Sequence, residues 1–388
     1  MDKLSPKIQE TINKIIKEEG YTNQNMEVLK VVTDGASYQG VLYEVNVRGQ
    51  TDNGDKETNI FIKHLIENYE NFKLYSVLEV YDREAFVYNE LAKVFKELQD
   101  EAEVPLKDRY KIVKSYRCST EAIILENIAK KGYKTYPRMN VMTLKLAELS
   151  VEQLAKFHAL TFALKVKRPD YFNNKITTIK QSMVFDDVYR DFIKKMFEIS
   201  LENLDEARKE KVANYFPTLV ENFPKYVQGA MTDVKCLCHG DYRISNIMIK
   251  ENDGVIADVI PIDYQQMYYG APVLDFIYLI FGASDRQFRK NHLNHLKEFY
   301  FETVGNFLKY FQVDVSSVYP REEFEKDFKN CLDYGLMFSL YFMPFFFALE
   351  DDSPDLNEEL LELSLKLDPR FKDRLQGIID DFVEWGHL

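Results

Sequence analysis

One short segment of this chain combines residue types that could carry out a group transfer. It covers residues 238–246 and reads CHGDYRISN. Asp241 and Asn246 lie five positions apart in it, so the carboxylate can accept the proton of an attacking hydroxyl while the amide oxygen binds a metal beside a nucleotide. Asp263 follows seventeen residues later at the end of an apolar strand, and carboxylates are the ligands that Mg²⁺ prefers beside phosphate oxygens. We therefore predict a base and metal site formed by these three residues; the alternative is a turn in which Asp241 and Asn246 only cap backbone groups.

The elements that must position this site change in character along the sequence. Residues 5–20 have the cap, the first-turn proline and the apolar period of a short amphipathic helix. From 29 to 126 the pattern is that of a meander of strands with a hairpin signal at Asn53-Gly54, and only residues 79–98 interrupt it with helical spacing. Beyond residue 130 the pattern is mainly helical, except for short strands between 234 and 263. The sequence predicts an α+β fold, in which a sheet lobe with one inserted helix precedes a helical lobe that begins near 127–136.

Two buried helices are expected in the second lobe. Ser150 and Gln153 have capping-box spacing ahead of an apolar helical series, which predicts a helix that starts at Ser150. Residues 336–349 form the longest apolar run, and we expect one buried helix there, because the run is too short and too interrupted by Pro344 to span a bilayer. A core helix is the default for its aromatic residues, although they are also compatible with a pocket for a flat apolar acceptor. These residues are Tyr341, Phe342, Phe345, Phe346 and Phe347.

The composition excludes several classes of function. The chain has 50 Lys and Arg residues against 63 Asp and Glu residues, and the net charge of −13 disfavours a role on nucleic acids or anionic membranes. The hydrophobic content of 46% is enough for a sizeable core and excludes disorder for most of the chain. The charged start lacks the apolar stretch of a signal peptide, and four scattered cysteines do not make a disulfide framework. We therefore expect a cytoplasmic protein.

The pattern Cys236-x-Cys238-His239 suggests zinc only superficially. No second cluster in the sequence completes a set of four ligands, so we interpret both cysteines as small buried hydrophobic residues. His158 lies within an apolar helical series, and we interpret it as a core histidine with satisfied hydrogen bonds.

Three strings of the chain resemble the protein-kinase-like phosphotransferases of small molecules, which include aminoglycoside and choline kinases, and above all the insect ecdysteroid-kinase-like family. They are HGDYRISN at 239–246, PIDYQQMYYGAPVLDFIYLI at 261–280 and AIILENIAKKGY at 122–133. The resemblance covers nearly the whole chain and implies a bilobal protein-kinase-like fold, with ATP and Mg²⁺ as cofactors. It divides the chain into a nucleotide-binding lobe at 1–127 and a helical lobe with the catalytic loop and the acceptor site at 128–388.

The chain also departs from that family beside the expected catalytic positions. The family usually has Leu-Trp and then Asn-Asn after HGD, whereas this chain has Tyr242, Arg243 and Ser245 there. Tyr264 replaces the phenylalanine of the family string IDFQ. The expected catalytic positions are kept, but the neighbours that shape the acceptor site differ.

Phosphoryl transfer also requires residues that hold the nucleotide. Gly35, Ser37 and Gly40 place small residues where backbone must approach a triphosphate, although a Gly-containing hairpin explains the same string. Lys63 lies in an apolar strand, where its ammonium group needs a buried anion, and phosphate oxygens are the natural partner. The alternative is that Lys63 is simply a charged residue on an edge strand.

A lysine that holds phosphates needs a carboxylate to fix its position. Glu84 lies on the inserted helix where the resemblance expects this partner, and Glu79 and Glu90 are the fallback choices. The alternative for Glu84 is an ordinary solvated helix face.

Three further roles are implied by the resemblance alone. Glu126 would offer its backbone carbonyl to the adenine amine, and Ile128 would offer an amide in the connector between the lobes. Asp275 would brace the catalytic loop through hydrogen bonds; the alternative is a first-turn acid that the helix dipole favours.

The predicted function is ATP- and Mg²⁺-dependent phosphorylation of a hydroxyl on a small molecule. In this hypothesis Lys63 contacts the phosphates, Asn246 and Asp263 bind Mg²⁺, and Asp241 orients and deprotonates the acceptor. The resemblance suggests an ecdysteroid, which is a steroid alcohol, as the acceptor. The alternatives are a detoxifying kinase of xenobiotic alcohols or phenols, a choline or aminoglycoside kinase, and a pseudokinase that only binds a ligand. We expect a monomer whose partner is a small molecule, without nucleic acid and without membrane insertion.

Overall fold

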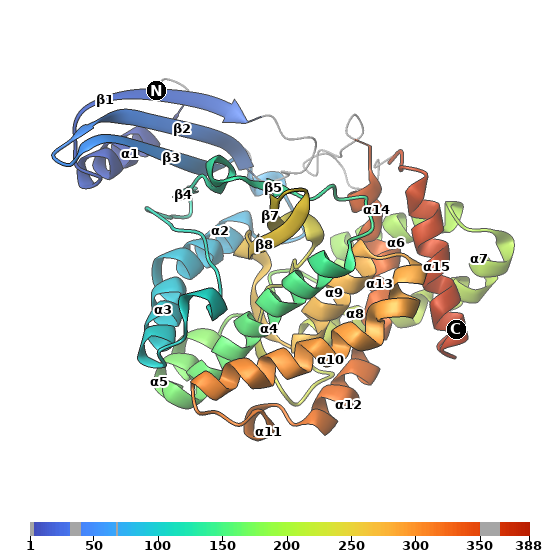
Figure 1. The fold of residues 1–388 in the computed structure, drawn as a ribbon. Coiled ribbons are helices and arrows are strands. Elements are labelled where there is room, and N and C mark those ends of the chain that lie inside the picture. The colour runs from blue at the N-terminus through green and yellow to red at the C-terminus, as the bar shows by residue number, and fades with distance from the viewer. Residues whose placement is uncertain (1–3, 32–39, 67–68, 350–364) are drawn as a thin grey trace.

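The structure is a computed structural model that describes residues 4–31, 40–66, 69–349 and 365–388. Its N-terminal part is a four-stranded antiparallel sheet in the order β1-β2-β3-β4, which extends away from a larger helical part (Figure 1). The elements of this part are α1 (Pro6–Glu18), β1 (Tyr21–Val31), β2 (Gly40–Thr51), β3 (Gly54–Leu65) and β4 (Ala122–Glu126). The predicted α+β fold class is confirmed.

One face of the sheet forms a small core with α1. Ser5 caps this helix as predicted, since its Oγ accepts a hydrogen bond from the backbone N–H of Ile8 at 3.4 Å. The isoleucines of α1 pack on alternate residues of β2 and β3, such as Val45 and its cross-strand partner Ile60, both fully buried. Because side chains alternate along a strand, Lys63 of β3 points to the opposite face of the sheet.

The inserted helix lies under that opposite face. It consists of α2 (Val77–Phe86), the π-helical turn η2 (Val87–Leu91) and α3 (Ala92–Glu101), which together contain the predicted helix at 79–98. Ser76 caps α2 by accepting a hydrogen bond from the backbone N–H of Glu79 at 3.3 Å. The buried face of α2 carries Glu84 and packs near β4, so the helix brings a carboxylate beneath the sheet.

The rest of the chain is mainly helical, as predicted (Figure 1). The helices before the catalytic loop are α4 (Leu144–Lys167), α5 (Pro169–Tyr171), α6 (Asp187–Glu202), α7 (Glu206–Ala213) and α8 (Phe216–Val227). Those after it are α9 (Pro272–Ala283), α10 (Arg286–Tyr310), α11 (Val315–Val318), α12 (Arg321–Cys331), α13 (Asp333–Tyr341), α14 (Met343–Phe347) and α15 (Arg370–Glu384). None of the helices in the described ranges is both long and apolar enough to cross a membrane.

The predicted start of α4 at Ser150 is wrong. The helix begins at Leu144, and its cap is Thr143, whose Oγ1 accepts a hydrogen bond from the backbone N–H of Leu146 at 3.2 Å. Ser150 is buried inside the helix and donates to the carbonyl of Leu146 at 2.7 Å, while Gln153 accepts from the backbone N–H of Lys111. Because both capping-box side chains have other partners, they do not cap a helix. The start of α4 is set instead by packing of the turn that precedes Ser150.

Short strands place the loop at residues 239–246, here called the catalytic loop, between two small sheets. β6 (Cys236–Cys238) pairs with β9 (Tyr268–Gly270) before the loop, and β7 (Ile247–Asn252) pairs with β8 (Val255–Pro261) after it. β5 (Tyr133–Thr135) adds to the second sheet beside β7. The strands predicted between 234 and 263 are confirmed, and β5 and β9 lie outside that range.

The single helix predicted at 336–349 is wrong, because α13 ends at Tyr341 and α14 starts at Met343. Pro344 has no N–H to donate to the carbonyl of Leu340, as a continuing helix would require. The hydroxyl of Ser200 on α6 donates to that carbonyl instead, at 2.8 Å.

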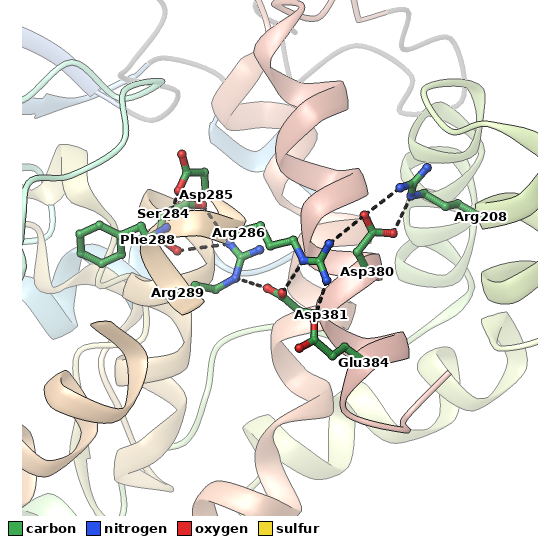
Figure 2. Close-up of polar contacts among 9 residues, drawn as sticks. All are labelled: Arg208, Ser284, Asp285, Arg286, Phe288, Arg289, Asp380, Asp381 and Glu384. Carbon is green, nitrogen blue, oxygen red and sulfur yellow. Dashed lines mark hydrogen bonds and ion pairs between the residues drawn. The ribbon is translucent and has the colours of Figure 1, made fainter. Parts of the chain in front are cut away.

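The C-terminal helix α15 packs against α13 and α14. Its apolar face is fully buried, and its polar face is attached to α10 and α7 by a set of ion pairs (Figure 2). At the centre of this set, Arg289 is buried and donates from Nε to Asp381 at 2.7 Å. The other members are Arg208, Arg286, Asp380 and Glu384. Burial of a charged pair requires such mutual neutralisation.

Candidate active site

Lys63 lies at the centre of a buried charge cluster under the sheet. Its Nζ is 3.1 Å from Oε2 of Glu84 and 3.0 Å from Oδ1 of Asp263. Burial opposes its charge, but the two carboxylates outweigh burial and raise the pKa of Lys63 above its ordinary value. Burial alone would raise the pKa of Asp263. The positive charges of Lys63 and then Arg243 outweigh burial and hold this pKa below the usual range. The ammonium is therefore charged and fixed by two acids from distant parts of the chain.

The fallback partners of Lys63 point elsewhere. Glu79 pairs with Arg83 at 2.6 Å, and Glu90 pairs with Lys175 at 3.5 Å. Burial raises the pKa of Glu84, and the opposing charge of Lys63 only partly offsets this rise. Of the three candidates, the structure brings Glu84 to Lys63.

The predicted phosphate cover is described only at its last residue. Gly35 and Ser37 lie outside the described residues. Gly40 opens β2, and a Cβ built on it would lie 2.8 Å from the hydroxyl of Tyr81 and 3.0 Å from Cγ of Lys63. A side chain at this position would collide with the hydroxyl of Tyr81 and crowd Lys63, in agreement with the need for a small residue there.

Asp241 of the catalytic loop is held by two hydrogen-bond donors and one ion pair. The hydroxyl of Tyr278 on α9 donates to its Oδ1 at 2.6 Å, and Nδ2 of Asn246 donates to its Oδ2 at 2.8 Å. Nε of Arg243 lies 3.2 Å from the same Oδ2. Burial, together with the neighbouring Asp241, raises the pKa of Tyr278 well above its ordinary value, so the phenol stays a neutral donor. The carboxylate is thus oriented from both sides.

Asn246 and Asp263 are brought together by strand pairing. They flank the β7–β8 hairpin, whose end is closed by a hydrogen bond from the backbone N–H of Ile262 to the carbonyl of Asn246 at 2.9 Å. Asp263 has φ of +67°, a left-handed conformation that is costly for a residue with a side chain. Such local strain is concentrated at functional sites.

The donor set of these two residues fits a hard divalent cation. Asn246 uses Nδ2 on Asp241, which leaves its amide oxygen as the atom suited to a cation, and Asp263 adds a carboxylate. The predicted pair therefore offers two oxygen ligands of the type that Mg²⁺ takes when phosphates and waters complete its shell.

Asp275 braces the catalytic loop from below. Its Oδ2 accepts a hydrogen bond from the backbone N–H of His239 at 2.6 Å, and its Oδ1 accepts one from that of Gly240 at 2.9 Å. Nε2 of His158 lies 3.1 Å from Oδ2, and Nδ1 of His158 lies 2.7 Å from the hydroxyl of Tyr300. The acid is buried, so its role is that of a fixed acceptor for the loop and not of an exposed first-turn residue.

The same contacts show whether His158 is available as a metal ligand. One ring nitrogen of His158 and the sulfur atoms of Cys236 and Cys238 lie within 4.8 Å of one another, and all three residues are fully buried. Both ring nitrogens of His158 already have hydrogen-bond partners, so no lone pair is left for a metal. The interpretation of His158 as a satisfied core histidine agrees with the structure.

Glu126 and Ile128 lie where β4 leaves the sheet. The Glu126 side chain pairs with Lys131 at 2.7 Å, and Asn127 between them caps the turn η4 (Ile128–Lys131) by accepting from the backbone N–H of Ala129. The segment joins the sheet to β5. Recognition of adenine by its backbone stays a prediction.

A cavity of about 230 Å³ opens from these charged residues and is here called the acceptor cavity. Lys63, Asp241, Arg243 and Asp263 line one end of it. The rest of the wall is mostly aromatic and comes from residues 72–75 and 181–183, from α6, α8, α13 and α14, and from the residues around β9 and α9. The aromatic lining residues are Phe72, Tyr75, Phe192, Phe223, Tyr268, Tyr278, Tyr334, Phe342, Phe345 and Phe346.

The aromatic residues noted in the sequence divide between this wall and the core. Phe342, Phe345 and Phe346 line the acceptor cavity, whereas Tyr341 and Phe347 are buried away from it. Phe342, Phe345 and Phe346 are spaced i, i+3 and i+4, so they lie on one helical face, whereas Tyr341 and Phe347 fall on either side of it.

Two residues at the site were missed as functional candidates. Tyr278 lies three positions after Asp275, so the two side chains lie on the same face of α9. This spacing is visible in the sequence and could have pointed to Tyr278. Arg243 was noted only as a departure beside the base. Tyr75 joins the wall because its backbone bridges to Met183, a contact between distant segments with no sequence signal.

Several solved structures and one family model are similar to this chain. Among curated proteins, none matches the chain in sequence. The solved structures similar to it include ethanolamine kinase of Plasmodium vivax, at 11% identity over 92% of this chain and 82% of that chain, with a TM-score of 0.41. A microcompartment-associated aminopropanol kinase is 12% identical over 97% and 98% of the two chains, with a TM-score of 0.44. An amicoumacin kinase is 13% identical over 99% and 97%, with a TM-score of 0.41.

The sequence also matches a family model over residues 34–313, which include Lys63, the catalytic loop and Asp275 and make up more than half of the chain. That model is the ecdysteroid kinase-like family, and the chain belongs to this family of small-molecule kinases.

Proposed function

We propose that the protein transfers the γ-phosphoryl group of ATP to a hydroxyl of a neutral, largely apolar alcohol, with an ecdysteroid as the leading acceptor. The observation that carries this proposal is the acceptor cavity, which has Asp241 at its charged end and an aromatic wall beyond it. An alcohol seated against this wall would present its hydroxyl to the carboxylate.

The charged end supplies what phosphoryl transfer needs from the protein. Lys63 binds phosphate oxygens and is held in place by Glu84. Mg²⁺ held by Asn246 and Asp263 would neutralise phosphate charge. Asp241 accepts the hydrogen bond of the acceptor hydroxyl, and its other contacts keep the carboxylate aimed into the cavity.

The cavity wall favours a neutral acceptor over a cationic one. Among the described residues that line it, the only carboxylates are Asp241 and Asp263, and each is ion-paired with a basic side chain. An amine acceptor would find no further acid to balance its charge, although the rings could still contact a cation. The volume of about 230 Å³ lies below the roughly 300–1,000 Å³ of typical ligand sites, which disfavours an oligosaccharide as the acceptor.

A few neutral polar groups interrupt the aromatic wall. Gln265 is 5% exposed, and its Nε2 has no hydrogen-bond partner among the described residues. Ser182 donates to Gln266 at 2.6 Å beside it. The donor on Gln265 matches the carbonyl and hydroxyl oxygens of a polyhydroxylated steroid, whereas a simple hydrocarbon alcohol would leave it unsatisfied.

The test is Mg²⁺-dependent ADP formation with an ecdysteroid, a simple phenol and ethanolamine as acceptors, with the product identified as a phosphate monoester by ³¹P NMR. We expect the steroid to give the highest kcat/KM, and Asp241→Asn to abolish turnover while nucleotide binding is retained. Asp233→Asn serves as the control, since Asp233 is exposed and pairs only with Lys326 at 3.0 Å among the contacts described for it.

The outcomes separate the competing functions. Preference for the phenol would support a detoxifying kinase, and preference for ethanolamine would contradict the neutral-acceptor proposal. Nucleotide binding without phosphorylation of any acceptor would favour a ligand-binding pseudokinase. Unchanged turnover in Asp241→Asn would remove Asp241 from its proposed role.

A further inference from the structure

Arg243 is a cation at the reacting end of the acceptor cavity, two residues after the proposed base. Its Nε lies 3.2 Å from Oδ2 of Asp241, and each of the two side chains is 19% exposed. Its guanidinium carbon lies 5.5 Å from the ring centroid of Phe346, which belongs to the aromatic wall. The guanidinium therefore lies between the reacting groups and the surface against which an acceptor would pack.

A permanent cation is not needed to hold Asp241 in place. The hydroxyl of Tyr278 and Nδ2 of Asn246 already donate to Oδ1 and Oδ2 at 2.6 and 2.8 Å. A guanidinium that stayed beside Oδ2 would compete with the acceptor hydroxyl for this oxygen. Its charge becomes useful when a negatively charged phosphoryl group arrives beside the base.

The two cations of the cavity have matching arrangements. Lys63 pairs with Asp263 at 3.0 Å, and Arg243 pairs with Asp241 at 3.2 Å. All four side chains line one end of the same cavity. A phosphoryl group that passes from a nucleotide near Lys63 to an acceptor near Asp241 would therefore travel from one cation toward the other.

We propose that Arg243 leaves Asp241 when acceptor and nucleotide bind and donates hydrogen bonds to the oxygens of the transferring phosphoryl group. In this step the acceptor oxygen forms a bond to the γ-phosphorus, the bond from that phosphorus to the bridging oxygen of ADP breaks, and the acceptor proton passes to Asp241. Arg243 keeps its protons and stabilises the negative charge. Its planar fork can contact two phosphoryl oxygens at once, which an ammonium cannot do. The inference rests on the proposed function and adds a catalytic residue to it.

The test compares binding of Mg·ADP with and without aluminium fluoride, which takes the place of the phosphoryl group in transfer. In the wild type we expect aluminium fluoride to tighten ADP binding. In Arg243→Gln we expect the affinity for ADP alone to be unchanged and the gain from aluminium fluoride to fall by about tenfold or more, as for loss of a charged hydrogen bond. In turnover, kcat should fall by about 100-fold with little change in KM for ATP.

Two further variants separate this role from a structural one. Arg243→Lys keeps the charge without the fork and should retain an intermediate kcat, and added guanidinium chloride should restore part of the activity of Arg243→Ala. Arg374→Gln is the matched control: Arg374 also lies over a ring of α14, at 6.0 Å from Phe347, but does not line the acceptor cavity. We expect it to keep the full gain from aluminium fluoride.

The result that overturns the inference is an equal gain from aluminium fluoride in Arg243→Gln and wild type. The proposed function would then stand, provided that the wild type still phosphorylates an acceptor. A wild type that binds no nucleotide would overturn both.

Discussion

The brace between Asp275 and the catalytic loop predicts a large effect of a very small substitution. Asp275→Asn changes one carboxylate oxygen to an NH₂ group and leaves the side chain almost the same size. In the structure, the two oxygens receive donors from His239, Gly240 and His158 at 2.6, 2.9 and 3.1 Å. Whichever oxygen is replaced, the new NH₂ group therefore faces at least one N–H group.

The size of the effect follows from these contacts. A hydrogen bond to a charged group contributes about 1.5–3 kcal/mol, and a buried donor left without a partner costs about 1–3 kcal/mol. These terms overlap, so we expect the free energy of unfolding of Asp275→Asn to fall by about 2–4 kcal/mol. Because Asp241 directly follows the two braced residues, a displacement of its carboxylate should also lower kcat, by about 100-fold for a shift on the order of 1 Å.

The assay is urea unfolding of wild type and variant together with steady-state kinetics on the proposed acceptor. Asp327→Asn is the control, since Asp327 is equally buried but accepts from the hydroxyl of Tyr319, at 3.1 Å, and the amide oxygen of asparagine can accept that bond too. If Asp275→Asn unfolds at the same urea concentration and turns over like the wild type, the loop is not held by this acid.

Two more predictions concern stability. Burial raises the pKa of Asp327 to about 6, above its unfolded value, so the folded protein binds the extra proton and the contribution of Asp327 to wild-type stability falls as pH rises between about 4 and 6. Asp327→Asn should therefore gain in Tm relative to the wild type as pH rises through this window; a constant difference between pH 4 and 7 would contradict the shift. Gly240 has φ of +79°, and a Cβ on it would lie 2.0 Å from the carbonyl oxygen of Gln266, so Gly240→Ala should lower Tm and displace Asp241. Gly254→Ala is its control, because Gly254 also has a positive φ, of +76°, but nothing lies within 4 Å of its added Cβ; equal losses in both variants would show that backbone conformation alone is responsible.

The aromatic wall shows why part of the site could not be read from the sequence. The wall residues come from segments that are more than a hundred positions apart, such as Tyr75, Phe192 and Phe346. Aromatic residues are also common in protein cores, so the residue type alone does not distinguish a cavity wall from a packed interior. Ser200 illustrates the same limit, because its bond to the carbonyl of Leu340 depends on how α6 packs on α13.

Asp241, Asn246 and Asp263 were accessible from sequence for a physical reason. Asp241 and Asn246 lie within one tight loop, and Asp263 follows the next hairpin, so short-range backbone geometry alone brings them near one another. The order of strand, helix and catalytic loop also made Glu84 the first candidate for Lys63. The contact itself, at 3.1 Å, depends on the register of β3 and the packing of α2.

The sequence by itself thus determined the fold class, the family and the chemical groups of the candidate site, because each of these is encoded in local patterns and short spacings. Only the tertiary structure decided which groups face one another: Tyr278 and Arg243 on Asp241, the Asp275 brace, and the aromatic cavity beyond them. These contacts join elements far apart along the chain. Packing selects them from many residues of similar type, and composition and periodicity do not specify that choice.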